Sequence, residues 1–211
     1  MTRYLATLLF AFSAVALGSS GNISKVNSSI TVEAGQQAGD VSTVNGSITI
    51  RDGARVRDAE TVNGSIKLHP RAEARAVETV NGSILVAEDV IVTGDVEAVN
   101  GDMTLNRGAR VDGRLENVNG EIELDSAAVR GGIETTNGDI RIGRGSTVDG
   151  GIHVEKPGGW GWSKSNRPPR VTVESGAVVN GTLRFDREVE LRVASDATIG
   201  PVEGVPPRRV H

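Results

Sequence analysis

The chain has 211 residues, a net charge of −4, few aromatic side chains and no cysteine. The weak negative charge offers no electrostatic basis for nucleic-acid binding, and the lack of cysteine excludes disulfides, thiol catalysis and cysteine-based zinc sites. A core filled with Val, Ile, Leu and Ala must be narrow, because few large side chains are available to fill a wide one.

Residues 1–20 have the pattern of a secretory signal peptide. Arg3 supplies the positive charge, residues 5–17 are almost entirely apolar, and Ala16 and Gly18 offer small residues for cleavage. The apolar stretch is short for a membrane span, although an uncleaved anchor is the alternative. We expect the mature protein to have no transmembrane segment and to cross the inner membrane to the periplasm or the cell surface.

After this segment, the tripeptide Val-Asn-Gly returns at a nearly fixed period. Degenerate copies precede and follow the series, and the steps between successive asparagines are 18, 18, 18, 19, 19 and 18 residues. A short fixed period indicates one structural unit stacked many times. The complete copies begin at Val44, Val62, Val80, Val99 and Val118.

Each period contains short apolar runs separated by turn residues. Ile66 and Leu68 alternate with Lys67, which is the period of two expected for a strand, and Val62 is predicted to point inward with them. Asn-Gly and two further glycine-containing turns supply three corners per period. The pattern therefore predicts an all-β, single-stranded parallel β-helix, or β-solenoid, with about nine coils of 18–19 residues and three short strands per coil.

The predicted inward positions recur from coil to coil. They include Ile48, Ile50, Ala54, Val56, Ala59, Met103, Leu105, Ala109, Val111, Leu115, Ile122, Leu124, Val129, Ile133, Ile140, Ile142, Val148 and Ile152. The period breaks at residues 156–170 and resumes at Val171. We expect a solenoid over residues 21–202, with 156–170 as an inserted loop, and a flexible tail at 203–211.

The corner pattern V-x-G-x-[IL] occurs twice in one coil, at Val111-Asp112-Gly113-Arg114-Leu115 and at Val118-Asn119-Gly120-Glu121-Ile122. With the coil length and the aliphatic core, it resembles the bactofilin, or polymer-forming cytoskeletal, family over residues 22–202. The resemblance implies a right-handed β-helix that joins end to end into filaments, and it implies no catalytic residues. Bactofilins are typically cytoplasmic and lack a signal peptide, so a secreted relative would keep the rod without the cytoskeletal role. Secreted adhesin-like solenoids also use Asn-Gly repeats.

The hand of the helix stays open at this stage. Val44, Ile50, Val56, Val62 and Leu68 are spaced six residues apart, and this spacing is typical of left-handed hexapeptide helices.

In-register stacking would align equivalent polar residues in columns. Stacked asparagine amides can hydrogen-bond from coil to coil, so we expect a structural ladder at the corner. Its members are Asn45, Asn63, Asn81, Asn100, Asn119 and Asn137.

A second column is acidic. We expect a solvated edge that keeps the rod soluble, with Ca²⁺ or another hard cation, or a basic partner surface, as alternatives. The calcium-binding β-roll pattern does not recur, and no cofactor is expected. The column contains Glu60, Glu78, Glu97, Glu116 and Glu134.

A third, partial column contains Thr43, Thr61, Thr79 and Thr135, which is the pattern of an ice-binding face. Ala98 and Asn117 interrupt it and glutamates flank it, which disfavours that function.

The inserted loop holds the candidates for partner binding. We expect the exposed aromatic and basic groups of this loop to bind a surface glycan or a partner protein. The alternative is that the tryptophans pack over an open face of the solenoid. The candidates are Trp160, Trp162, Lys164, Arg167 and Arg170.

No histidine cluster is visible, because His69, His153 and His211 are far apart in the repeat scheme. An enzyme is therefore not expected. The sequence predicts a non-enzymatic secreted scaffold of the cell envelope that is structural or polymer-forming and has itself as partner. The alternative is an adhesin-like module that uses the tryptophan loop to bind a cell-wall or surface glycan, or a partner protein.

Overall fold

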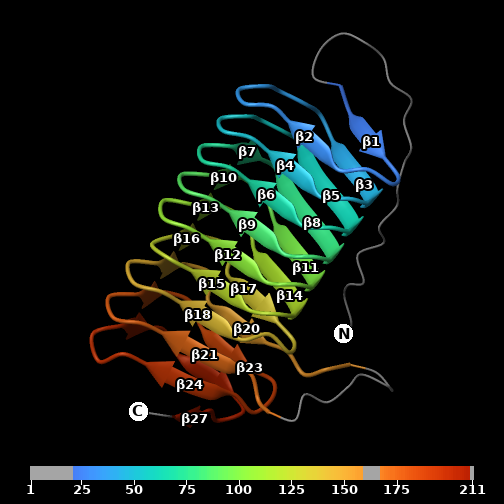
Figure 1. The fold of residues 1–211 in the computed structure, drawn as a ribbon. Coiled ribbons are helices and arrows are strands. Elements are labelled where there is room, and N and C mark those ends of the chain that lie inside the picture. Colours follow the sequence, from blue (N-terminus) through green and yellow to red (C-terminus); the bar gives the residue numbers. More distant parts are fainter. Residues whose placement is uncertain (1–20, 159–166, 210–211) are drawn as a thin grey trace.

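The computed structural model describes residues 21–158 and 167–209, which form a rod of stacked coils (Figure 1). Three parallel sheets run along the rod, two with ten strands and one with seven, and the first two coils meet the third sheet only through isolated bridges at Gln37 and Arg55. The described residues contain no helix. The predicted all-β solenoid with about nine coils and three strands per coil is confirmed.

Sheet A is the sheet whose strands lead into the Asn-Gly corners. Its ten strands are β1 (Ile23–Lys25), β3 (Val41–Asn45), β5 (Asp58–Asn63), β8 (Ala76–Asn81), β11 (Val96–Asn100), β14 (Leu115–Asn119), β17 (Ile133–Thr135), β20 (Ile152–Val154), β23 (Leu183–Phe185) and β26 (Val202–Gly204).

Sheet B begins after that corner. Its ten strands are β2 (Ile30–Val32), β4 (Ile48–Ile50), β6 (Ile66–Leu68), β9 (Ile84–Val86), β12 (Met103–Leu105), β15 (Ile122–Leu124), β18 (Ile140–Ile142), β21 (Arg170–Val173), β24 (Glu190–Val193) and β27 (Arg208–Arg209).

Sheet C closes the triangle with shorter strands. They are β7 (Glu73–Ala74), β10 (Ile91–Val92), β13 (Arg110–Val111), β16 (Ala128–Val129), β19 (Thr147–Val148), β22 (Val178–Val179) and β25 (Thr198–Ile199).

The register follows the sequence period. Asn63 pairs with Asn81, and Ile66 pairs with Ile84. Val171 pairs with Ile140, so the stack continues across the inserted loop as the resumed period predicts. Equivalent side chains therefore lie in columns along the rod.

The core is a single aliphatic cluster that extends along the rod. All eighteen inward positions named above are buried, which confirms that part of the prediction. Phe185 is the one aromatic side chain in this core cluster, and it is fully buried.

One predicted inward position is wrong. Val62 is half-buried on the outer face of sheet A, and Thr61 is buried beside the core in its place. Strand β5 alternates from Ala59 inside to Thr61 inside, so Val62 must point outward. The Asn-Gly corner then changes the phase of the alternation, and Ile66 points inward again. A pattern of alternating inward and outward residues that is continued through the corner therefore assigns Val62 to the wrong face of the sheet.

The solenoid also extends beyond its predicted end. Strand β26 pairs with β23, and β27 pairs with β24. Residues 203–209, for which a flexible tail was predicted, are therefore part of the last coil, because the free edges of sheets A and B offer them backbone partners. No helix in residues 21–158 and 167–209 has the length and apolar character needed to cross a membrane.

Candidate functional site

The Asn-Gly corner carries a continuous amide ladder. From Asn45 to Asn137, each Nδ2 donates a hydrogen bond to Oδ1 of the asparagine one coil earlier, with N···O distances of 2.8–3.1 Å. At the C-terminal end of the ladder, Arg187 Nη1 donates to Asn137 Oδ1 at 2.8 Å. Each amide oxygen in the series thus accepts one such bond, and this column is a structural feature of the corner.

The threonine column lies inside the rod and supports the same corner. Thr43, Thr61 and Thr79 are buried, and each Oγ1 donates to a corner carbonyl of the preceding coil at 2.9–3.0 Å. Asn117 Nδ2 makes the equivalent bond to Gly101 O at 2.8 Å. The ice-binding interpretation is therefore wrong, because these side chains satisfy backbone carbonyls in the interior and face no solvent.

The acidic column runs along the outer face of sheet A in strict register. Glu60 pairs with Glu78, and the series continues through Glu97 and Glu116 to Glu134. Adjacent parallel strands lie about 4.8 Å apart, so these carboxylates are close neighbours.

Two carboxylates in the middle of this column lack a cationic partner among the described residues. Arg114 Nη1 lies 3.5 Å from Glu116 Oε1, but neither Glu78 nor Glu97 has an ion pair within the part of the chain that the structure describes. Burial on the sheet surface, followed by the charges of Glu78, Glu116 and Asp95, raises the pKa of Glu97 to about 7. At pH values between 4.5 and 7, Glu97 therefore keeps a proton that an isolated glutamate would release.

This shift predicts a stability that depends on pH. The native state binds the Glu97 proton more tightly than the unfolded state, where the pKa keeps its ordinary value of 4.5. The stabilising contribution is therefore complete below pH 4.5 and is lost as pH rises through 7. We expect Glu97→Gln to be more stable than the wild type by about 1 kcal/mol at pH 8, after solvent screening, and nearly equal at pH 4.

Urea unfolding at pH 4, 6 and 8 measures this difference. Glu33→Gln, which replaces an exposed glutamate outside the column, is the matched control and should follow the wild-type profile. A Glu97→Gln profile parallel to that of the wild type at all three pH values would contradict the prediction.

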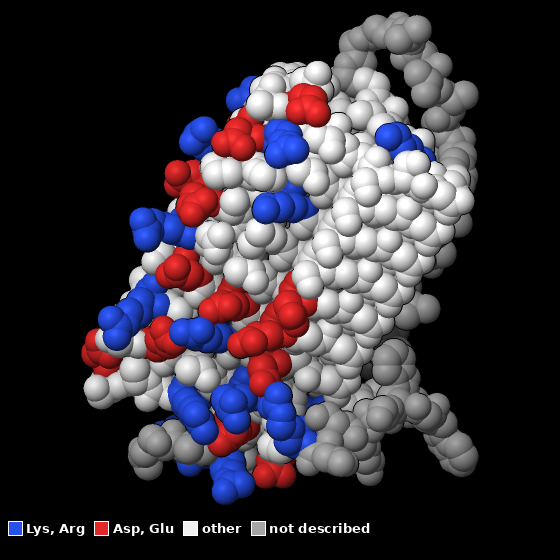
Figure 2. Space-filling model, in the orientation of Figure 1, with Lys and Arg blue, Asp and Glu red and all other residues white. Residues whose placement is uncertain are grey.

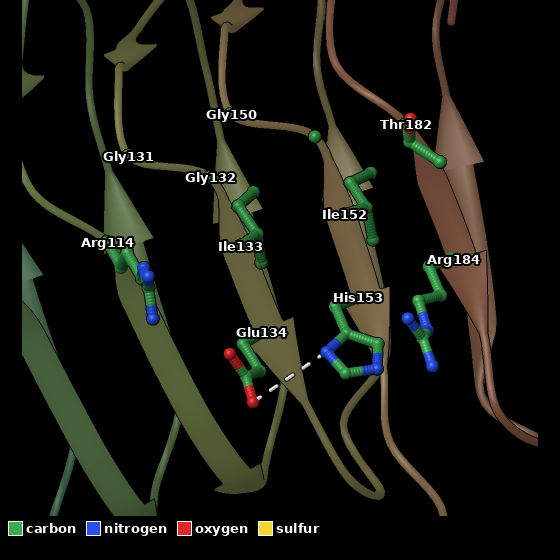
Figure 3. Close-up of a pocket in the computed structure, with 11 residues that line it drawn as sticks. Arg114, Gly131, Gly132, Ile133, Glu134, Gly150, Ile152, His153, Thr182 and Arg184 are labelled. Carbon is green, nitrogen blue, oxygen red and sulfur yellow. Dashed lines mark ion pairs between the residues drawn. The ribbon is translucent and has the colours of Figure 1, made fainter. Parts of the chain in front are cut away.

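The acidic column ends in a mixed cluster. The position after Glu134 in the register is His153, followed by Arg184. His153 Nδ1 lies 3.8 Å from Glu134 Oε1 (Figure 3). On the other side of the ring, His153 Nε2 lies 2.9 Å from Asp186 Oδ2. Glu155 lies beside the same pair, so that one ligand atom from each of Glu134, His153 and Glu155 is within 4.8 Å of the others. Two carboxylates and an imidazole therefore converge on the surface of sheet A.

The charges of this cluster influence one another. Burial, and then a hydrogen bond and the charge of Glu155, raise the pKa of Glu134 to about 7. The hydrogen bond from His153 lowers the pKa of Asp186, which also accepts a hydrogen bond from Arg184 Nε at 3.0 Å.

A shallow hollow of about 400 Å³ lies next to the cluster, with Arg114 and Arg184 on opposite sides of it (Figure 3). Its wall contains glycines because the coils stack too closely there for a side chain: a Cβ on Gly131 would lie 2.5 Å from the Gly113 backbone. The wall glycines are Gly131, Gly132, Gly150 and Gly151.

Sequence reasoning missed this cluster. Ile152 is buried as the sequence predicts, and the residue after it, His153, occupies the glutamate position of the preceding coils. Extending the acidic column by one coil would have placed His153 next to Glu134. Asp186 carried no such signal, because the inserted loop separates it from His153 in the sequence.

A second hollow, of about 520 Å³, lies over sheet B. Its central Arg141 is already paired, with Glu123 Oε1 at 2.7 Å and with Glu174 Oε1 at 2.7 Å. Figure 2 shows acidic and basic side chains gathered on one side of the face that it presents, with a run of adjacent acidic side chains near the centre, while the other side of this face carries almost no charge.

The loop candidates divide into two groups. Trp160, Trp162 and Lys164 lie outside the described residues. Arg167 forms two hydrogen bonds with the Asp139 carboxylate, at 2.8 and 2.9 Å, and Arg170 pairs with Glu190 at 3.2 Å. Both arginines thus make ion pairs within the chain at the C-terminal side of the loop, and partner binding through this loop stays a prediction.

Comparison with known proteins finds no matching family model, no similar curated protein and no similar solved structure. The function must therefore be inferred from the fold and its residues.

Proposed function

We propose that the chain is a non-enzymatic scaffold of the cell envelope, exported across the inner membrane, whose rods join end to end into a polymer. The proposal agrees with the bactofilin resemblance of the sequence. The observation that carries it is the distribution of exposed apolar side chains. Among the described residues, four large hydrophobic side chains are exposed. Three of the four lie on the terminal coils, namely Val26, Val193 and Val205.

The backbone at the two ends supports the same function. At the N-terminal end of the described rod, β1 and β2 are paired on one side only, and at the other end the same holds for β25, β26 and β27 (Figure 1). No helix among the described residues covers either end. Solenoids that remain monomeric need polar capping units, whereas free strand edges are templates for pairing with another chain.

A head-to-tail contact uses both ends at once. The C-terminal edge of one rod placed on the N-terminal edge of the next would continue sheets A and B, which both reach the N-terminal end, in the same direction. Such a contact between two different surfaces does not close on itself, so it produces an open filament.

Electron microscopy and size-exclusion chromatography with light scattering test the proposal. We expect the purified protein to form filaments, or oligomers whose mass rises with concentration. Val193→Lys with Val205→Lys should prevent this assembly, because charged side chains at a free strand edge oppose edge-to-edge pairing. Ile91→Lys is the matched control, because Ile91 is exposed to a similar degree on β10, a strand of sheet C that is paired on both sides.

The control variant should assemble like the wild type. A wild-type protein that stays monomeric over the whole concentration range would contradict the proposal. Equal assembly of the Val193→Lys/Val205→Lys variant would show that the C-terminal end is not the contact.

A further inference from the structure

Among the described residues, three side chains that can bind a metal ion lie close together. They are on the side of the rod, away from its ends. We propose that Glu134, His153 and Glu155 bind a divalent transition-metal ion, with Zn²⁺ as the best-matched cation. The site is independent of end-to-end assembly, because none of its residues belongs to the exposed apolar ends. It rests on the ligand types, on their distances and on the support around the histidine.

The distances suit one ion. Zinc bonds to nitrogen and oxygen are about 2.0–2.2 Å long, so tetrahedral ligand atoms lie about 3.4 Å apart. His153 Nδ1 and Glu134 Oε1 are 3.8 Å apart, which is too long for a hydrogen bond and close to that ligand spacing. With Glu155 included, one ligand atom from each of the three residues lies within 4.8 Å of the other two.

A carboxylate accepts a hydrogen bond from the second ring nitrogen of His153, as is common for metal-binding histidines. Asp186 Oδ2 accepts the hydrogen bond of His153 Nε2 at 2.9 Å, which leaves the lone pair of Nδ1 directed toward Glu134. A carboxylate on the far nitrogen fixes the tautomer and the ring orientation of a metal ligand. Arg184 Nε in turn holds Asp186 through Oδ1 at 3.0 Å.

The backbone fixes the four side chains relative to one another. Glu134 and His153 are register partners in adjacent strands, and the Glu155 N–H donates to Thr135 O at 2.8 Å. The Asp186 N–H donates to Val154 O at 2.9 Å, which ties the supporting carboxylate to the same sheet. The hollow beside the cluster leaves room for water as a further ligand.

The ligand types select the class of metal. An imidazole favours zinc and its transition-metal neighbours, whereas calcium and magnesium prefer oxygen ligands alone. The earlier positions of the column, from Glu60 to Glu116, supply carboxylates without an imidazole and do not share this preference. A bound ion would link the coil of β17 to the coil of β20, directly before the inserted loop.

Isothermal titration of the purified, tag-free protein with Zn²⁺ at pH 7.5, after removal of metal with a chelator, tests the site. We expect one saturable site per chain, with Ca²⁺ binding at least about 100-fold more weakly. His153→Ala should weaken Zn²⁺ binding about 100-fold, and Asp186→Asn about 10-fold, as expected for a ligand and for its supporting group. Zn²⁺ should also raise the melting temperature of the wild type.

His69→Ala is the matched control, because His69 Nδ1 lies 3.7 Å from Asp52 Oδ1 and belongs to no group of three ligands among the described residues. This variant should bind Zn²⁺ like the wild type. Circular dichroism verifies that the variants fold, and Glu155→Gln replaces His153→Ala if the latter does not. The absence of saturable Zn²⁺ binding by the wild type, or binding that folded His153→Ala or Glu155→Gln retains in full, would overturn the proposal.

Discussion

Replacing Gly101 with alanine is expected to lower the free energy of unfolding by about 3 kcal/mol or more. A Cβ at this position would lie 1.9 Å from the Gly82 carbonyl oxygen and 2.5 Å from its carbonyl carbon. Both atoms belong to the backbone of the preceding coil, so no side-chain rotation relieves the clash. The two coils must separate at the corner, which stretches the amide ladder and the adjacent sheet hydrogen bonds.

Chemical denaturation measures this loss. Gly158→Ala is the control, because a Cβ there meets nothing within 4 Å, and we expect it to change stability by less than about 0.5 kcal/mol. A Gly101→Ala protein as stable as this control would show that the corner is less closely packed than described.

Truncating Phe185 to alanine is expected to cost about 3–5 kcal/mol. The side chain is fully buried and is the largest in the core cluster. It stands in register with Val154 on one side and with Gly204 on the other, so the cavity opens between the last coils. Because each coil contacts mainly its neighbours, the damage should be local.

Hydrogen exchange distinguishes local from global loss. Amides of β20, β23 and β26 should exchange faster in Phe185→Ala, while those of β5 and β8 keep their protection. Ile91→Ala, which truncates an exposed aliphatic side chain, should leave both groups unchanged. Uniform loss of protection along the whole rod would contradict this picture of coupling between neighbouring coils.

The architecture could be predicted from the sequence because the repeat makes the register visible. Once Asn63 is aligned with Asn81, the parallel pairing, the three sheets and most of the core follow from the period of two within each strand. The errors arose where that period is interrupted. Val62 lies just before a corner that resets the alternation, and residues 203–209 carry no repeat signature although free strand edges bind them.

The Glu134–His153–Glu155 cluster is less visible because it breaks the repeat. Its histidine substitutes once for a recurring glutamate, and its supporting Asp186 comes from beyond the inserted loop. A single substitution in a periodic column looks like variation until the distances to its neighbours are known. The raised pKa of Glu97 likewise depends on burial between strands, which the column alone does not reveal.

The direction of the hydrogen bonds gives the rod a mechanical character. In all three sheets they connect one coil to the next, and so run along the long axis. A pulling force on the two ends loads the coil junctions in series, while the bonds within a junction share the load. The weakest junction then sets the tensile strength of the rod. Compression and bending are instead resisted by the close-packed interior of the whole stack.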